Sequence, residues 1–163
     1  MFAIWFLFDK NDNDYLHNII QDLSRQYKST VFLPHITAYG LTEIPLDAID
    51  KIVLKSIEDV KPFFVEKIRI NYSDDFWKTL FIEIKQNEYL NKINKKLTNE
   101  LSKFSKFEFL PHVSLIYKKM NEKEQENLAN NLDIKDSFLI SKIGILDFSE
   151  NIADWKIVSE HKF

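Results

Sequence analysis

One short segment occurs twice in the chain, at about half its length. Phe32-Leu33-Pro34-His35-Ile36-Thr37 returns as Phe109-Leu110-Pro111-His112-Val113-Ser114, with the two histidines 77 residues apart (112 − 35 = 77). Four of the six residues are identical, and the last two are replaced by residues of the same kind. Self-similarity at a fixed offset is typical of a duplicated architecture. The repeat therefore predicts two similar lobes.

The predicted elements follow the same offset. Hydrophobic periodicity and turn signals predict the order strand, helix, strand, helix, strand in each half. In the first half, strands are predicted at 2–8, 35–39 and 63–72, and helices at 15–27 and after Pro45. Asp12 to Asp14 are capping candidates for the first helix. In the second half, strands are predicted at 79–85, 112–117 and 137–147, and helices at 89–101 and 121–132, the latter begun by an Asn121 and Glu124 capping pair. One more strand is predicted at about 155–162. We predict an α+β fold in one domain, 1–163, with pseudo-symmetric lobes of about 1–73 and 74–163 whose sheets face each other across a central cleft.

Composition excludes several classes of site. The chain has 2 glycines and no cysteine, which rules out glycine-rich phosphate loops, thiolate metal sites and a cysteine nucleophile. A net charge of −3 argues against a protein that binds polyanions through a basic surface. No signal peptide or membrane-spanning stretch is apparent, so we expect a soluble, cytoplasmic protein without a membrane partner. We also expect a monomer.

The repeated strands carry the candidate catalytic groups. Side chains two residues apart share one face of a strand, so His35 and Thr37 point the same way, as do His112 and Ser114. Two such strands facing each other would present two imidazoles and two hydroxyls to one cleft. Histidine can serve as base or acid near neutral pH, and hydroxyls can hold charged phosphate oxygens. Such a set suits hydrolysis of a phosphodiester, in which a base takes a proton from water and an acid gives a proton to the leaving oxygen. We assign His112 as that base and His35 as that acid, and we expect no metal and no cofactor.

These motifs resemble the 2H phosphoesterase superfamily, and within it the cyclic phosphodiesterase branch. The resemblance covers essentially the whole chain. It is carried by Ile4-Trp5, by 33–37, by the Pro-His-x-Ser-Leu-x-Tyr pattern of 111–117, and by the tail from Ile145 to Val158. It implies a duplicated fold with antiparallel-type sheets and outer helices. It also implies hydrolysis of a nucleoside 2′,3′-cyclic phosphate or ADP-ribose 1″,2″-cyclic phosphate, with His35 and His112 as catalytic residues and Thr37 and Ser114 as phosphate-binding residues.

Aromatic residues near the motifs are candidates for contact with a nucleobase or ribose. Tyr117 follows the second motif, Tyr39 is next along the face of His35 and Thr37, and Trp5 lies on the first strand, where a core role is the competing interpretation. The two other histidines have structural interpretations: we expect His17 at the surface and His161 as a packed residue on the inward face of the last strand. The four histidines show no zinc-site spacing.

Two other functions stay open. The chain could be a 2H enzyme that acts on RNA ends or oligonucleotides, as 2′–5′ ligase-like proteins and hydrolases of signalling nucleotides do, or a non-catalytic nucleotide-binding module. The acidic pI of about 5.8 and the scarcity of long insertions favour a small nucleotide substrate. Two intact histidine and hydroxyl pairs favour catalysis over binding alone.

Overall fold

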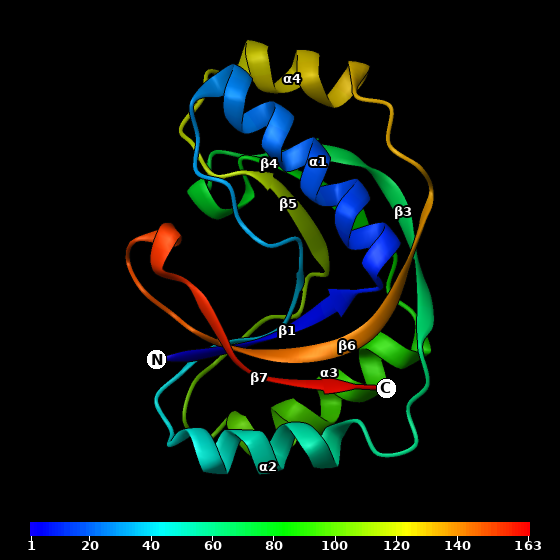
Figure 1. Ribbon diagram of the computed structural model, residues 1–163, viewed down its shortest axis with the longest axis vertical. Helices are drawn as coiled ribbons and strands as arrows, with labels where there is room; N and C mark the ends of the chain where they lie inside the picture. Colours follow the sequence, from blue (N-terminus) through cyan, green and yellow to red (C-terminus); the bar gives the residue numbers. More distant parts are fainter.

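The computed structural model describes residues 1–163 and has an α+β architecture, as predicted (Figure 1). The strands are β1 (Phe2–Phe8), β2 (Ile36–Thr42), β3 (Phe63–Tyr72), β4 (Leu80–Ile84), β5 (His112–Ile116), β6 (Ser137–Asp147) and β7 (Lys156–Lys162). The helices are α1 (Lys10–Tyr27), α2 (Leu46–Ser56), α3 (Glu88–Leu101) and α4 (Glu122–Asn131), with short 3-10 turns η1 (Phe76–Lys78) and η2 (Ile152–Asp154). The order of elements predicted for both halves is confirmed.

The strands pair antiparallel in the order β2-β1-β6-β3-β4-β5, and β7 joins the edge of β6. β3 connects the two parts of this sheet, because Phe63–Glu66 pair with β6 whereas Lys67–Tyr72 pair with β4. One part therefore holds β1, β2, β6 and β7, and the other holds β3, β4 and β5. β3, the third strand of the first half, therefore lies with β4 and β5 of the second half. β6, the third strand of the second half, lies with β1 and β2 of the first half.

The helices are exchanged in the same way. α1 packs on β5 and α3 packs on β2, while α4 contacts β3 and α2 contacts α3. In Figure 1, α1 and α4 lie at one end of the molecule and α2 and α3 lie at the other, with the strands between them. The boundary near residue 73 marks the sequence repeat, but each layer of the fold contains elements from both halves.

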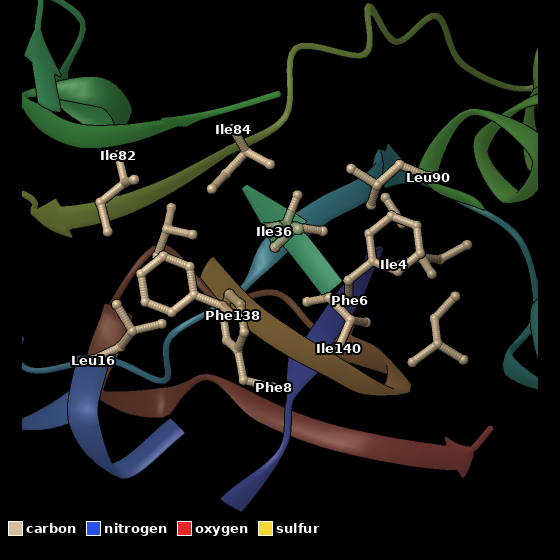
Figure 2. Close-up of a cluster of buried hydrophobic side chains, with 14 of the residues drawn as sticks. Ile4, Phe6, Phe8, Leu16, Ile36, Ile82, Ile84, Leu90, Phe138 and Ile140 are labelled. Atoms are coloured by element: carbon tan, nitrogen blue, oxygen red, sulfur yellow. The ribbon is translucent and has the colours of Figure 1, made fainter. Parts of the chain in front are cut away.

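The central strands have no exposed face, which explains the continuous apolar run at the start of the chain. On β1, Ile4, Phe6 and Phe8 belong to the main core, whereas Ala3, Trp5 and Leu7 form a second cluster with Leu146. Figure 2 shows Phe6 and Phe8 of β1 beside Phe138 and Ile140 of β6 and near Leu16 of α1. Burying each side chain of this size contributes about 1.5–3 kcal/mol. The core therefore fixes β1 and β6 at the centre of the molecule.

The start of the first helix differs from the prediction. The N-cap is Asp9, whose carboxylate accepts the amide of Asn11, rather than one of the residues Asp12 to Asp14. Asp12 is buried instead: its carboxylate accepts the Leu139 amide at 2.6 Å and forms an ion pair with Lys135. Asp12 therefore joins α1 to β6, a tertiary role that local capping rules do not reveal.

At α4 the predicted cap is confirmed, since the Asn121 side chain accepts the Glu124 amide at 2.9 Å. None of the helices combines the length and the apolar character needed to cross a membrane.

Candidate active site

Both repeated motifs lie at one cavity. β2 and β5 approach each other in the interior, His35 immediately precedes β2, and His112 is the first residue of β5. Both histidines, with Thr37 and Ser114, line a cavity of about 440 Å³. The four residues singled out from the sequence are therefore brought together by elements 77 residues apart (112 − 35 = 77).

The Leu-Pro-His sequence sets the same side-chain hydrogen bond in both halves. Nδ1 of His35 lies 2.7 Å from the carbonyl oxygen of Leu33, and Nδ1 of His112 lies 2.7 Å from that of Leu110. A carbonyl can only accept, so Nδ1 carries the proton in each ring. The intervening proline has a fixed φ, which limits the orientations of this carbonyl relative to the histidine. Nε2 of each neutral imidazole is consequently left as an unprotonated acceptor.

The surroundings of the two imidazoles differ. His35 is only 6% exposed, and the indole of Trp5 stacks on its ring with centroids 3.4 Å apart and planes within 8° of parallel. Burial lowers the pKa of His35 to about 3, against the effect of the bond to Leu33, and the nearby His112 lowers it further. His35 is therefore neutral at physiological pH.

His112 is less enclosed than His35. It is partly buried, and Phe81 meets its ring edge-on with centroids 5.5 Å apart. Burial lowers the pKa of His112, and its bond to Leu110 opposes that shift. The charge of Lys78 lowers the same pKa, whereas Asp75 raises it.

The two hydroxyl groups are not equivalent either. Thr37 is partly exposed at the cavity, and its hydroxyl makes no hydrogen bond within the protein, so this hydroxyl is free for a ligand. Ser114 is 4% exposed, and its hydroxyl donates to the Trp77 carbonyl at 2.7 Å. The structure thus places both residues at the cavity but gives only one of them a free hydroxyl.

Of the three aromatic candidates, two line the cavity and one does not. Tyr117 lines it and stacks on Phe32 at 4.0 Å, and burial raises the pKa of its phenol, which stays protonated. Trp5 also lines the cavity, but with only 3% of its surface exposed and one face covered by His35 it cannot offer an open stacking face.

Tyr39 was expected on the face of His35 and Thr37, and that expectation is wrong. Its side chain is fully buried, and its hydroxyl donates to the Ser105 carbonyl at 2.7 Å. Trp5 pairs with Thr37 whereas Ile4 pairs with Tyr39, so β2 contains one extra residue relative to β1. This β-bulge breaks the alternation of faces. Gly40 lines the cavity in place of Tyr39.

Sequence reasoning missed several residues of the cavity wall. Trp77 of η1 and Trp155, directly after η2, both line it, and their rings stack at 5.8 Å with an interplanar angle of 24°. Phe148 and Lys78 line it as well. The two tryptophans stand 78 residues apart (155 − 77 = 78), each in the connection after the third strand of its half. Their separation nearly equals the offset of the repeated motifs, and this near match is the feature of the sequence that could have identified the two tryptophans as a pair.

Comparison with known proteins places the whole chain in one family. The family model described as cyclic phosphodiesterase-like protein matches residues 1–163. The chain belongs to this family, within the 2H phosphoesterase superfamily. Cyclic phosphodiesterase from Arabidopsis thaliana is 19% identical over 139 residues, which cover 85% of this chain and 77% of that protein.

Solved structures share the fold of this cyclic phosphodiesterase-like protein. Escherichia coli LigT in complex with 3′-AMP superposes with a TM-score of 0.66 at 10% identity, over 99% of this chain and 96% of that one. The protein TT0787 of Thermus thermophilus gives a TM-score of 0.64 at 10% identity, with 99% and 96% coverage. LigT has also been crystallised with ATP, with a TM-score of 0.64.

The other two histidines of this cyclic phosphodiesterase-like protein lie outside the cavity. His161 is packed as expected: its Nε2 lies 2.8 Å from Asp50 of α2, and Ser159 donates to the same carboxylate oxygen at 2.5 Å. His17 is partly buried rather than at the surface, and its Nδ1 has no hydrogen-bond partner. No three histidine, aspartate or glutamate side chains are grouped so that they could hold a metal ion.

Proposed function

We propose that this protein hydrolyses the cyclic phosphodiester of a small nucleotide, either a nucleoside 2′,3′-cyclic phosphate or ADP-ribose 1″,2″-cyclic phosphate. One observation carries the proposal: two imidazoles of unequal burial line one cavity, each held by Nδ1 with Nε2 free. Membership of the cyclic phosphodiesterase-like family supports the same reaction class.

The environments of the histidines favour a division of roles opposite to our assignment from sequence. His35 has the more strongly lowered pKa and is neutral, which suits a base. His112 is less enclosed and holds a proton more readily, which suits an acid. Nε2 of His35 takes a proton from water as the water oxygen bonds to phosphorus. The bond from phosphorus to one ring oxygen breaks, and His112 gives that oxygen its proton. The product is a phosphomonoester, and the step consumes only water.

The cavity suits a small nucleotide better than a polynucleotide. A volume of about 440 Å³ lies in the range of sites for small ligands. Its wall combines Trp77, Tyr117 and Trp155 with the polar groups near the histidines, and aromatic rings of this kind can stack on a base. Lys78 is the one lysine or arginine in the lining, beside the acidic Asp75 and Glu108. An RNA strand requires a track of basic residues, which this lining does not offer. Action on RNA ends is therefore the second candidate.

A substrate panel assayed in EDTA tests the proposal. It contains ADP-ribose 1″,2″-cyclic phosphate, the four nucleoside 2′,3′-cyclic phosphates, cyclic dinucleotides and a short RNA with a 2′,3′-cyclic end, with products separated by isomer. We expect metal-independent ring opening of at least one small cyclic phosphate. Hydrolysis of the RNA end alone would support the second candidate, and no hydrolysis of any substrate would contradict the proposal.

A further inference from the structure

The loop between α3 and β5 leads directly into the second motif and has few attachments of its own. It comprises residues 102–111, and no hydrogen bond between backbone groups involves residues 106–110. The Leu110 carbonyl, which accepts from Nδ1 of His112, lies in this stretch. The orientation of the His112 ring therefore depends on what holds the α3–β5 loop in place.

Tyr39 of β2 provides the better of two side-chain hydrogen bonds that reach this loop from outside the second motif. Its side chain is fully buried, and its hydroxyl donates to the Ser105 carbonyl at 2.7 Å. The other donor, the exposed Gln86, lies 3.5 Å from the Phe109 carbonyl, which is longer than the usual range for a hydrogen bond. A residue of the first motif strand thus anchors a loop of the second half.

Phe107 packs the loop against the same part of β2. The centroid of its ring lies 5.4 Å from that of the Tyr39 ring. A Cβ atom at Gly40 would come within 2.8 Å of the Phe107 ring, so the lack of a side chain at Gly40 permits this approach. Gly40 and Phe107 both line the cavity. The loop is therefore held on the cavity wall by two adjacent residues of β2.

The β-bulge in β2 directs Tyr39 toward the core, where it meets the loop. Ala38 is the extra residue of this bulge, between Thr37 at the cavity and Tyr39 in the core. Asn94 of α3 donates to the Ala38 carbonyl at 2.9 Å, which satisfies a backbone group at the bulge. Both α3 and the loop that follows it are thus attached to this one irregularity of β2.

The segment before the first motif is held in a corresponding way by the second. Tyr117, which follows β5, stacks on Phe32 of the segment that precedes His35, with ring centroids 4.0 Å apart. The next residue, Lys118, donates to the Tyr27 carbonyl at the end of α1. The segment before each catalytic candidate therefore rests on residues that follow the other one.

We propose that Tyr39 is a positioning residue for His112, acting through the α3–β5 loop, although in the sequence it follows His35. Its hydroxyl and the ring of Phe107 keep the loop on the cavity wall, so that the Leu110 carbonyl stays within reach of Nδ1 of His112. Each imidazole is thereby oriented by the other half of the chain. This inference rests on the proposed function, because the orientation of His112 matters for the proton that it gives to the leaving oxygen.

NMR of the imidazole nitrogens tests this inference, with His35 as an internal control. At about pH 8 both imidazoles are neutral, and their nitrogen chemical shifts report which nitrogen carries the proton. We expect Tyr39→Phe to leave His35 protonated at Nδ1 and to give His112 a measurable fraction protonated at Nε2, because the freed loop no longer holds the Leu110 carbonyl in place. Phe107→Leu, a change in a partly exposed side chain, should have the same selectivity and serves if Tyr39→Phe fails to fold.

Steady-state kinetics of the same variants provide a second readout. We expect Tyr39→Phe to lower kcat about tenfold and to change KM by less than about twofold, because a misplaced acid acts mainly on the transition state and a small displacement can cost up to about 10²-fold. Tyr15→Phe is the matched control, since its hydroxyl also makes one bond to a backbone group, accepting the Lys135 amide at 3.0 Å, and lies outside the cavity. This control should change neither kcat nor the proton position on His112.

Several results would overturn the inference. Equal changes at both imidazoles in Tyr39→Phe would mean that Tyr39 supports only its own strand. An unchanged His112 in both Tyr39→Phe and Phe107→Leu would mean that the loop does not set its orientation, and a wild-type kcat despite a changed His112 would remove Tyr39 from catalysis. An inactive wild type would contradict the proposed function, and the NMR comparison of the two histidines would still decide whether Tyr39 positions His112.

Discussion

Two histidines with the same backbone bond differ because of what covers them. Trp5 lies flat on His35 and excludes water, whereas His112 is only partly covered. Since burial disfavours the charged imidazole, a single proton shared by the pair resides mainly on His112. In the proposed reaction the pair would therefore start as one base and one acid, although the motifs are nearly identical.

This division predicts the pH dependence of kcat/KM, which reports the free enzyme. The one-proton state exists between the pKa of His35, about 3, and the pKa of His112, which is below its ordinary value of 6.5. We expect kcat/KM to be highest on the acid side of pH 6.5 and to fall by roughly tenfold per pH unit once His112 loses its proton. Steady-state assays from pH 4 to 8.5 measure this profile. Activity that still rises above pH 7 would contradict it.

Among the elements, η1 shows where sequence reasoning reached its limit. That His35 and His112 share a strand face with the hydroxyl residues that follow them could be predicted, because the alternation of side chains between the two faces of a strand is a local property. The bulge that turns Tyr39 into the core could not, since it depends on the pairing of β2 with β1. Trp77 and Lys78 were missed for a related reason: their polar turn looks like an ordinary connection until Gln125 and Ser114 attach it to the site.

The attachment of η1 predicts a stability effect. Gln125→Leu leaves the carbonyls of Ser73 and Thr79 without their donor, and an unsatisfied buried group costs about 1–3 kcal/mol. We expect a loss in this range in urea unfolding, together with a lower kcat, because the turn carries part of the cavity wall. Asn131→Ala, at an exposed amide of the same helix that bonds only to Asn127, should change stability by less than about 0.5 kcal/mol. Equal stabilities of the two variants would refute this role of Gln125.

For the whole molecule, the exchange of strands and helices between the halves couples the site to global stability. His35 lies where β1, β2 and the connection at Trp155 meet, so the folded protein keeps it neutral and enclosed. The repeat revealed the duplicated order of elements. It did not reveal that each half packs its first helix and third strand with elements of the other half, because that arrangement is decided by long-range packing.

The enclosure of His35 predicts how stability depends on pH. Between pH 3 and 6.5 the unfolded chain protonates His35 and the folded protein does not, so unfolding takes up a proton and stability falls as pH falls. Between pH 7 and 4.5 this group alone should remove about 2.5 kcal/mol, because the pH falls about two units below the unfolded-state pKa of 6.5, at about 1.36 kcal/mol per unit. His35→Asn keeps a donor for the Leu33 carbonyl but does not titrate, so its unfolding free energy should depend less on pH. The same pH dependence in the variant and the wild type, measured by urea unfolding, would show that His35 is not the group responsible.

In the proposed mechanism His35 and His112 act as one acid–base pair, and single-turnover rates of three variants test this pairing. We would compare His35→Asn, His112→Asn and the double variant with the wild type, in EDTA, on the best substrate of the panel. We expect a loss in rate of about 10²–10⁴ for each single variant, and a double variant scarcely slower than the worse single one, because removing either member disables the pair. A single variant with wild-type rate, or two losses that multiply in the double variant, would contradict it.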